Sequence, residues 1–237
     1  MFKIALNAGH YINEAGKRTL KSIDPNETRE WVLNDRVCDK VEALLTGYDG
    51  YELVRIDDTT GQNNLTIAER AAKANQFDAD IYIAVHHNAG INGGSGGGIM
   101  AFVYTSVGDA TKNLQRLLYE KLIAKTGLRG NRSSPLSSAN FGELRLTKMP
   151  AVLLELGFMD STTDTPIILT EDFANRCAEA IVEAIVELGG LTKKATPPPT
   201  GDTLYRVQVG AFRERANAEA MLKRLKDLGF DAFIKAD

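Results

Sequence analysis

The sequence predicts an α/β domain with a largely parallel sheet and helices on both faces, followed by a small C-terminal strand–helix–strand segment. Strand-like and helix-like apolar patterns alternate up to about residue 190. Residues 81–89, IYIAVHHNA, form a continuous apolar run of strand length, as expected for a central strand that is covered on both faces. A proline-rich stretch then separates the two parts.

Each element of the first part has a local signature. Strands are expected at residues 2–8, 51–57, 81–89, 99–105 and 151–158, and helices at 26–45, 66–77, 106–125 and 170–188. The first helix carries an apolar stripe at Leu33, Val37, Val41 and Leu44, and the last carries one at Phe173, Cys177, Ile181, Ala184 and Leu188. Thr66 and Glu69 form a capping box. Ser106 and Asp109 give a similar cap signature, and Gly190 ends the last helix.

We therefore expect three regions: an α/β domain at 1–190, a linker at 191–203 and a small segment at 204–237. The linker contains three consecutive prolines and no apolar periodicity. The last region shows a strand pattern, a helix with its stripe at Ala218, Met221, Leu222 and Leu225, and a second strand after Gly229.

Composition narrows the class of protein. The net charge of −3 gives no general basic footprint, so we expect no nucleic-acid partner. No apolar run is long enough to span a bilayer, so we expect no membrane insertion. The first residues alternate as a strand and lack a basic region before an apolar one, so we expect no signal peptide. We therefore expect the protein to accumulate in the cytoplasm until it is released from the cell. Cys38 and Cys177 lie in helical segments and are expected to be free thiols.

The three histidines of the chain fall at strand ends. His10 follows the first strand, and His86 and His87 end the central strand. Glu155 lies in another buried strand, between two leucines. Because ligands bind beyond the carboxyl ends of the strands in such sheets, we expect these side chains to border one site.

A carboxylate from the first helix completes the set. Glu30 precedes Leu33 by three residues and Val37 by seven, so its phase places it on the core-facing side, near the helix start. Glu27 is an earlier candidate, but an acid in the first turn is already explained by the helix dipole. Two imidazoles and a carboxylate with one open position form the usual catalytic zinc shell. From the residues alone, the more ordinary interpretations, a structural histidine and a capping glutamate, are favoured over a metal site.

Residues 1–190 resemble the zinc-dependent N-acetylmuramoyl-L-alanine amidases of bacteria and phages. The resemblance rests on ordered motifs: ALNAGH, ETREWVLND, ERAAKAN, YIAVHHNAG and LRLTKMPAVLLELGFMDS. Within them the likeness selects Glu30 with Asn34, and His86 rather than His87. The family usually has Asp-Pro-Gly-His-Gly-Gly at its first ligand, where this chain has Asn-Ala-Gly-His-Tyr, and a small residue where this chain has His87.

The resemblance implies an activity and a set of roles. The activity is zinc-dependent hydrolysis of the amide bond between N-acetylmuramic acid and L-alanine in peptidoglycan. His10, Glu30 and His86 would hold Zn²⁺, and Glu155 would act as general base with a pKa raised by its leucine surroundings. Arg145 is expected either to hold the oxyanion or a stem-peptide carboxylate, or to be an ordinary surface arginine. Asn88 is expected either to position substrate or to orient His86.

Two alternatives to the amidase remain. The first is a zinc peptidase that cuts a stem-peptide bond with the same site. The second is a non-catalytic wall-binding protein on the same fold, which the complete set of site residues disfavours.

The C-terminal segment resembles one repeat of the SPOR family of peptidoglycan-binding domains, in the stretches YRVQVGAF and ANAEAMLKRLKDLGFDAFI. Such domains usually comprise two strand–helix–strand halves, and one half is present here. Because a single half buries too little apolar surface to be stable alone, we expect a truncated domain, a half that pairs with another chain, or a poorly ordered tail.

Overall fold

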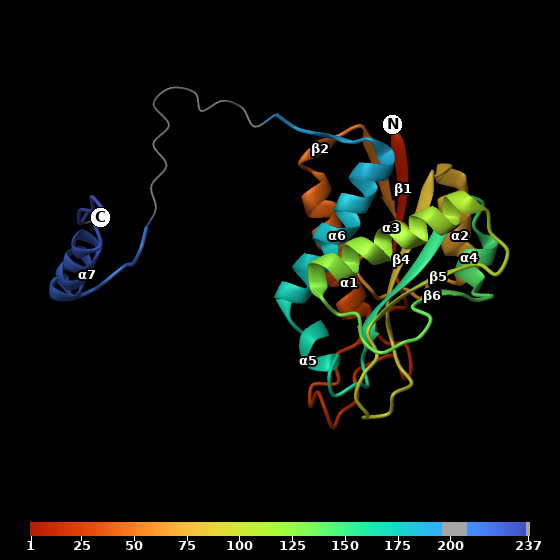
Figure 1. The fold of residues 1–237 in the computed structure, drawn as a ribbon, viewed down its shortest axis with the longest axis horizontal. Coiled ribbons are helices and arrows are strands. Elements are labelled where there is room, and N and C mark those ends of the chain that lie inside the picture. Colours follow the sequence, from red (N-terminus) through yellow and green to blue (C-terminus); the bar gives the residue numbers. More distant parts are fainter. Residues whose placement is uncertain (196–207, 236–237) are drawn as a thin grey trace. The chain divides into compact units, whose positions relative to one another are not determined.

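The computed structural model describes residues 1–195 and 208–235, which form two units, Met1–Lys194 and Ala195–Asp237 (Figure 1). The strands are β1 (Phe2–Ala8), β2 (Tyr48–Asp49), β3 (Tyr51–Arg55), β4 (Ile81–Asn88), β5 (Ile99–Val103), β6 (Leu136–Ser138), β7 (Ala151–Phe158) and β8 (Thr192–Lys193). The helices are α1 (Glu30–Leu45), α2 (Ile67–Phe77), α3 (Asp109–Thr126), α4 (Gly142–Leu146), α5 (Thr165–Ile168), α6 (Glu171–Gly189) and α7 (Arg215–Asp227).

The first unit is built on a six-stranded sheet with the order β3-β1-β4-β7-β5-β6. The strands β3, β1, β4 and β7 are parallel, and β4 lies between β1 and β7. This confirms a largely parallel sheet with residues 81–88 at its centre. Strand β5 is antiparallel to β7, and β6 is parallel to β5. A glycine-rich loop without a helix joins β4 to β5, and a short loop of this kind returns the chain in the opposite direction.

Helices cover both faces of the sheet (Figure 1). On one face, α1, α3 and α6 pack over a large apolar core that includes Leu6, Val85 and Leu154. On the other face, α2 and α4 cover a smaller cluster that includes Tyr82 and Leu153. Residues on one strand therefore alternate between the two cores, which fixes the direction of every side chain at the strand ends.

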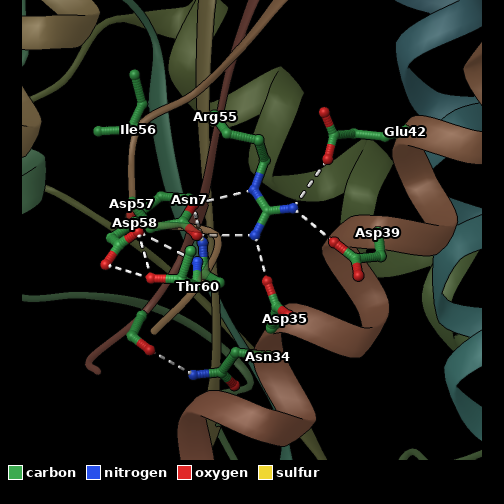
Figure 2. A network of polar contacts seen from close by, with 12 residues as sticks. Asn7, Asn34, Asp35, Asp39, Glu42, Arg55, Ile56, Asp57, Asp58 and Thr60 are labelled. Carbon is green, nitrogen blue, oxygen red and sulfur yellow. Dashed lines mark hydrogen bonds and ion pairs between the residues drawn. The ribbon is translucent and has the colours of Figure 1, made fainter. Parts of the chain in front are cut away.

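A buried arginine ties α1 to the sheet (Figure 2). The side chain of Arg55 is 6% exposed, and its guanidinium forms ion pairs of 2.5 to 2.9 Å with four carboxylates, those of Asp35, Asp39, Glu42 and Asp57. Asp57 also accepts a hydrogen bond of 3.0 Å from the backbone N–H of Ala8, at the end of β1. The network thus links α1, β3 and the strand that leads into the functional site.

Several expected boundaries differ from the structure. Helix α1 begins at Glu30, four residues later than expected, because Glu27 has a positive φ of 49° and lies in the preceding loop. The explanation of Glu27 by the helix dipole was therefore wrong, and its carboxylate pairs with Arg18 instead. The apolar stripes were wrong at their ends: Leu44 is 40% exposed while Leu45 is buried, and Leu188 is 42% exposed.

Other differences fall in short elements. Helix α3 begins at Asp109 after Gly108, without a side-chain cap, so the expected cap at Ser106 was wrong. The expected strands at 51–57 and 99–105 end at Arg55 and Val103. The capping box at Thr66 and Glu69 is present, as predicted. The short elements β6, α4 and α5 carry too little periodicity for a pattern of 3.6 or 2 residues to be recognised.

The second unit contains one described helix, α7, as the sequence predicts. Its expected apolar stripe is its least exposed side, although within residues 208–235 no α7 residue is fully buried. Those same described residues contain no strand, and residues 205–207 of the first expected strand lie outside them. Strand β8 pairs with β2, so the first residues of the expected linker belong to the first unit. None of the described helices has the length and apolarity to cross a membrane.

Candidate metal centre and active site

Three side chains that are far apart in sequence meet at the carboxyl end of the sheet. They are His10, just after β1, Glu30, at the start of α1, and His86, near the end of β4. Glu30 Oε1 lies 3.2 Å from His10 Nε2 and 3.2 Å from His86 Nδ1. One candidate ligand atom from each residue lies within 4.8 Å of the other two. Glu30 and His86 are buried, and His10 is partly exposed.

The loop that carries His10 is held in an uncommon conformation. His10 has a positive φ of 67°, which costs conformational energy in a non-glycine residue. Arg70 of α2 stabilises it by donating hydrogen bonds to the carbonyl oxygens of Ala8 and His10. Asn34 of α1 donates to the carbonyl oxygen of Gly9. Arg70 and Asn34, which lie in the amidase-like motifs, therefore position His10 without belonging to the cluster.

Gly9 lies directly against the imidazole of His86. A Cβ at this position would lie 2.0 Å from His86 Cε1, so only glycine fits between the first strand and the ring.

The side chain of Glu30 is ionised. Burial alone would raise its pKa, but the hydrogen bonds from His10 and His86 outweigh burial and hold the pKa of Glu30 well below its usual range. Lys17 Nζ lies 3.7 Å from its second oxygen, Oε2. The cluster therefore places the negative charge of Glu30 between two imidazoles. Two imidazoles and one carboxylate are a donor set typical of a divalent metal site.

Strand alternation explains why the two adjacent histidines differ. His86 shares a face of the sheet with Tyr82, and His87 points to the opposite face, where its Nδ1 lies 2.8 Å from Asn34 Oδ1. Burial lowers the pKa of His87 to about 3, so this ring is neutral. This geometry fits the prediction that His86 belongs to the site and His87 is a structural neighbour.

The outer nitrogens of both site imidazoles face carboxylates. His10 Nδ1 lies 2.8 Å from Glu14 Oε2. His86 Nε2 lies 3.8 Å from Oε1 of Glu143, a buried residue of α4. Burial alone would lower the pKa of His86, but Glu143 and Glu30 raise it to about 10 in the metal-free protein. Binding of a metal would therefore displace a proton from this ring.

Glu155 borders the cluster from the neighbouring strand. It is the register partner of His86 across the parallel pair β4–β7, so both side chains point to the same face of the sheet. Its Oε2 is buried and, among the described residues, has no hydrogen-bond partner. Burial raises the pKa of Glu155 to about 7, as the sequence predicts, and this value suits a group that takes and returns a proton near neutral pH.

The residues present fit a zinc ion. Tetrahedral zinc with bonds of about 2.0 to 2.1 Å has ligand atoms about 3.3 Å apart, close to the two distances of 3.2 Å at Glu30 Oε1. Within the described part of the chain, Glu30 Oε2 is also buried without a hydrogen-bond partner. Buried polar atoms are rarely left unpaired, so a group that satisfies them is expected at this site.

Arg145 and Asn88 stand apart from the cluster. Arg145 is exposed and donates a hydrogen bond to Asn140. It lies two residues after Glu143 on α4, and positions two apart on a helix do not face the same side. The amide of Asn88 contacts Met100, and its oxygen accepts from the N–H of Ala89. None of the described hydrogen bonds of Asn88 reaches His86, so their substrate-binding roles stay predictions.

Two carboxylates near the site were missed from the sequence. Glu14 lies in a loop without periodicity, and its spacing of four residues from His10 was its one local signal. Glu143 lies in a helix of five residues, and its partners Asn7 and Tyr82 come from strands far away in the chain. No local pattern predicts such contacts.

The comparison with protein families identifies the first unit. Residues 4–187 match the sequence profile of the N-acetylmuramoyl-L-alanine amidases. The chain belongs to this amidase family. The amidase is 28% identical over 234 residues to the N-acetylmuramoyl-L-alanine amidase CwlM of Bacillus licheniformis, covering 99% of this chain and 85% of that relative. It is 31% identical over 192 residues to the endolysin of Bacillus phage SPP1, covering 80% of this chain and 67% of the endolysin.

Solved structures agree on the fold. The catalytic domain of CwlV, an N-acetylmuramoyl-L-alanine amidase from Bacillus (Paenibacillus) polymyxa, superposes with a TM-score of 0.69 at 24% identity, over 79% of this chain and 98% of that one. Residues 187–237 match the SPOR domain. The amidase is therefore a peptidoglycan hydrolase with a SPOR segment. This favours the N-acetylmuramoyl-L-alanine amidase over the two alternatives, the zinc peptidase and the non-catalytic wall-binding protein.

Proposed function

We propose that the amidase is zinc-dependent and that His10, Glu30 and His86 hold the ion. The observation that carries this proposal is the position of Glu30 Oε1, 3.2 Å from a nitrogen of each histidine. When bound, zinc would supply a Lewis acid that polarises the scissile carbonyl and lowers the pKa of its bound water to about 7. Two neutral imidazoles and one carboxylate leave the ion a net positive charge for this task.

In this proposal Glu155 is the general base. It takes a proton from the attacking water and returns it to the nitrogen of the leaving L-alanine. Its pKa of about 7 in the metal-free protein and its position beside His86 support this role. Arg145 and Asn88 would bind the substrate, with the exposed side chain of Arg145 exchanging its hydrogen bond to Asn140 for a stem-peptide carboxylate.

The SPOR segment would hold the amidase on its substrate, peptidoglycan. Its apolar side chains Val209, Phe230 and Phe233 are more than half exposed, which supports pairing with the same segment of another chain. The site of action would be the cell wall. Both cysteines are free and buried, which suits a reducing compartment, so the protein would be held in the cytoplasm until release. A processed, exported form in growing cells would contradict this location.

Metal analysis tests the zinc site. The purified full-length protein should contain about one zinc per chain, and chelation should abolish hydrolysis of peptidoglycan until zinc is restored. His10→Ala and Glu30→Ala should lose both the metal and the activity. Glu27→Ala is the matched control, because Glu27 lies outside α1 and should keep both. Full zinc content in Glu30→Ala, or metal loss in Glu27→Ala, would overturn the ligand assignment.

A further inference from the structure

The two ring nitrogens of His86 face two different carboxylates. Nδ1 lies 3.2 Å from Glu30 Oε1, inside the metal cluster. Nε2 lies on the other side of the ring, 3.8 Å from Glu143 Oε1. In the part of the chain that the structure describes, Nε2 is buried and has no hydrogen-bond partner. An imidazole that binds a metal through one nitrogen carries its proton on the other, and a buried N–H requires an acceptor.

The position of Glu143 is fixed by other residues. Its second oxygen, Oε2, accepts hydrogen bonds of 3.0 Å from Asn7 Nδ2 and of 3.0 Å from the hydroxyl of Tyr82. Asn7 is held in turn by Arg70, whose Nη1 donates to Asn7 Oδ1 at 2.7 Å. These bonds engage Oε2 and leave Oε1 directed at His86. Glu143 is only 7% exposed, and a buried carboxylate is costly unless it is paired or hydrogen-bonded, so Oε1 is expected to have a partner as Oε2 does.

The other histidine of the cluster has the same arrangement, and its outer nitrogen is within hydrogen-bond distance of a carboxylate. His10 Nε2 faces Glu30, while His10 Nδ1 and Glu14 Oε2 are 2.8 Å apart. Each imidazole thus has one nitrogen toward the cluster and one toward a carboxylate outside it. The two differ in burial, because Glu14 is partly exposed and Glu143 is buried.

We propose that Glu143 is a positioning residue: its Oε1 accepts a hydrogen bond from the Nε2–H of metal-bound His86, which orients the ring so that Nδ1 faces the metal. This inference rests on the zinc site proposed above. It assigns a role to the hydrogen-bonded chain from Arg70 through Asn7 to Glu143. It also explains why α4, a helix of five residues, carries a buried acid.

The test is the zinc affinity of the full-length protein, measured by competition with a chromophoric chelator. Glu143→Ala should weaken zinc binding by about 10- to 100-fold, as removal of a partner of a metal-bound histidine does. Glu143→Gln keeps an acceptor oxygen and should lose less. The ligand-field absorption of the cobalt-substituted protein should change in Glu143→Ala, because the His86 ring loses its fixed orientation.

Tyr82→Phe is the matched control. It removes one hydrogen bond to Glu143 Oε2 and should lower the melting temperature while leaving Oε1 available to His86, with zinc affinity close to wild type. If the Glu143 variants fold, lose thermal stability and still bind zinc and cobalt as the wild type does, Glu143 is only structural and the inference is wrong. If the wild type itself binds no zinc, the proposed metal site fails, and this inference fails with it.

Discussion

Replacing Glu155 by Gln should abolish hydrolysis and at the same time stabilise the metal-free protein at alkaline pH. The two effects have one cause, which is the burial of an acid beside the cluster. Loss of the general base should lower turnover by about a hundred- to ten-thousand-fold. The gain in stability follows from the pKa of Glu155, which burial raises from 4.5 to about 7.

The sign and size of the stability effect follow from proton linkage. Between pH 4.5 and about 7 the folded state holds a proton on Glu155 that the unfolded state has released, so stability falls as the pH rises through this window. Above it, the buried charge costs about 3 kcal/mol, at about 1.4 kcal/mol per pKa unit. Gln carries no charge, so the variant should be more stable by about 3 kcal/mol at pH 8 and by about 1 kcal/mol at pH 5.

Thermal unfolding of the chelator-treated protein measures this difference. For a domain of this size about 3 kcal/mol corresponds to roughly 6 to 12 °C, so Glu155→Gln should melt higher than the wild type by that amount at pH 8. Glu143→Gln is the matched control of opposite sign. Burial alone would raise the pKa of Glu143, but its ion pair with the protonated His86 ring outweighs burial and lowers the pKa, so the ionised form of Glu143 stabilises the fold and Glu143→Gln should melt lower than the wild type. A Glu155→Gln variant that melts at or below the wild type at pH 8 would refute the reasoning.

Three further predictions concern the packing of Gly9 against His86, the ion pairs of Arg55 and the SPOR segment. Gly9→Ala should push the His86 ring out of place and lower activity by about a hundredfold, measured as turnover of a soluble muropeptide. Arg55→Met should leave four carboxylates without their shared cation and lower the free energy of unfolding by about 3 kcal/mol or more in urea titration. Removal of residues 196–237 should leave turnover of the soluble substrate unchanged and weaken sedimentation with sacculi; unchanged sacculus binding would contradict a role for the SPOR segment.

Much of the catalytic fold was predictable because its central strands are buried on both faces. Residues 2–8 alternate, and residues 81–85 and 151–154 are continuous apolar runs of strand length, as expected for strands covered on both faces. The reversal of β5 was not predicted, since nothing in an apolar pattern gives the direction of a strand. The strands expected around α7 are absent from residues 208–235, and residues 205–207 of the first of them lie outside the described part of the chain.

The site was predictable where the chain marks it locally. His10 and His86 stand at the ends of clear strands, and the spacing from Glu30 to Leu33 gives the correct face of α1 even though the helix begins later than expected. Glu143 was not predictable, because its contact with Asn7 joins residues 136 positions apart. Such contacts depend on how α4 packs on the sheet, and a five-residue helix carries no signal for that.

Mass spectrometry of digested sacculi tests the central claim most directly. Purified peptidoglycan would be treated with the zinc-loaded protein, the chelated protein and the Glu155→Gln variant. The account predicts that only the zinc-loaded wild type releases peptides with a new N-terminal L-alanine and leaves N-acetylmuramic acid without peptide. Cleavage within the stem peptide, or equal release by the chelated protein, would contradict it.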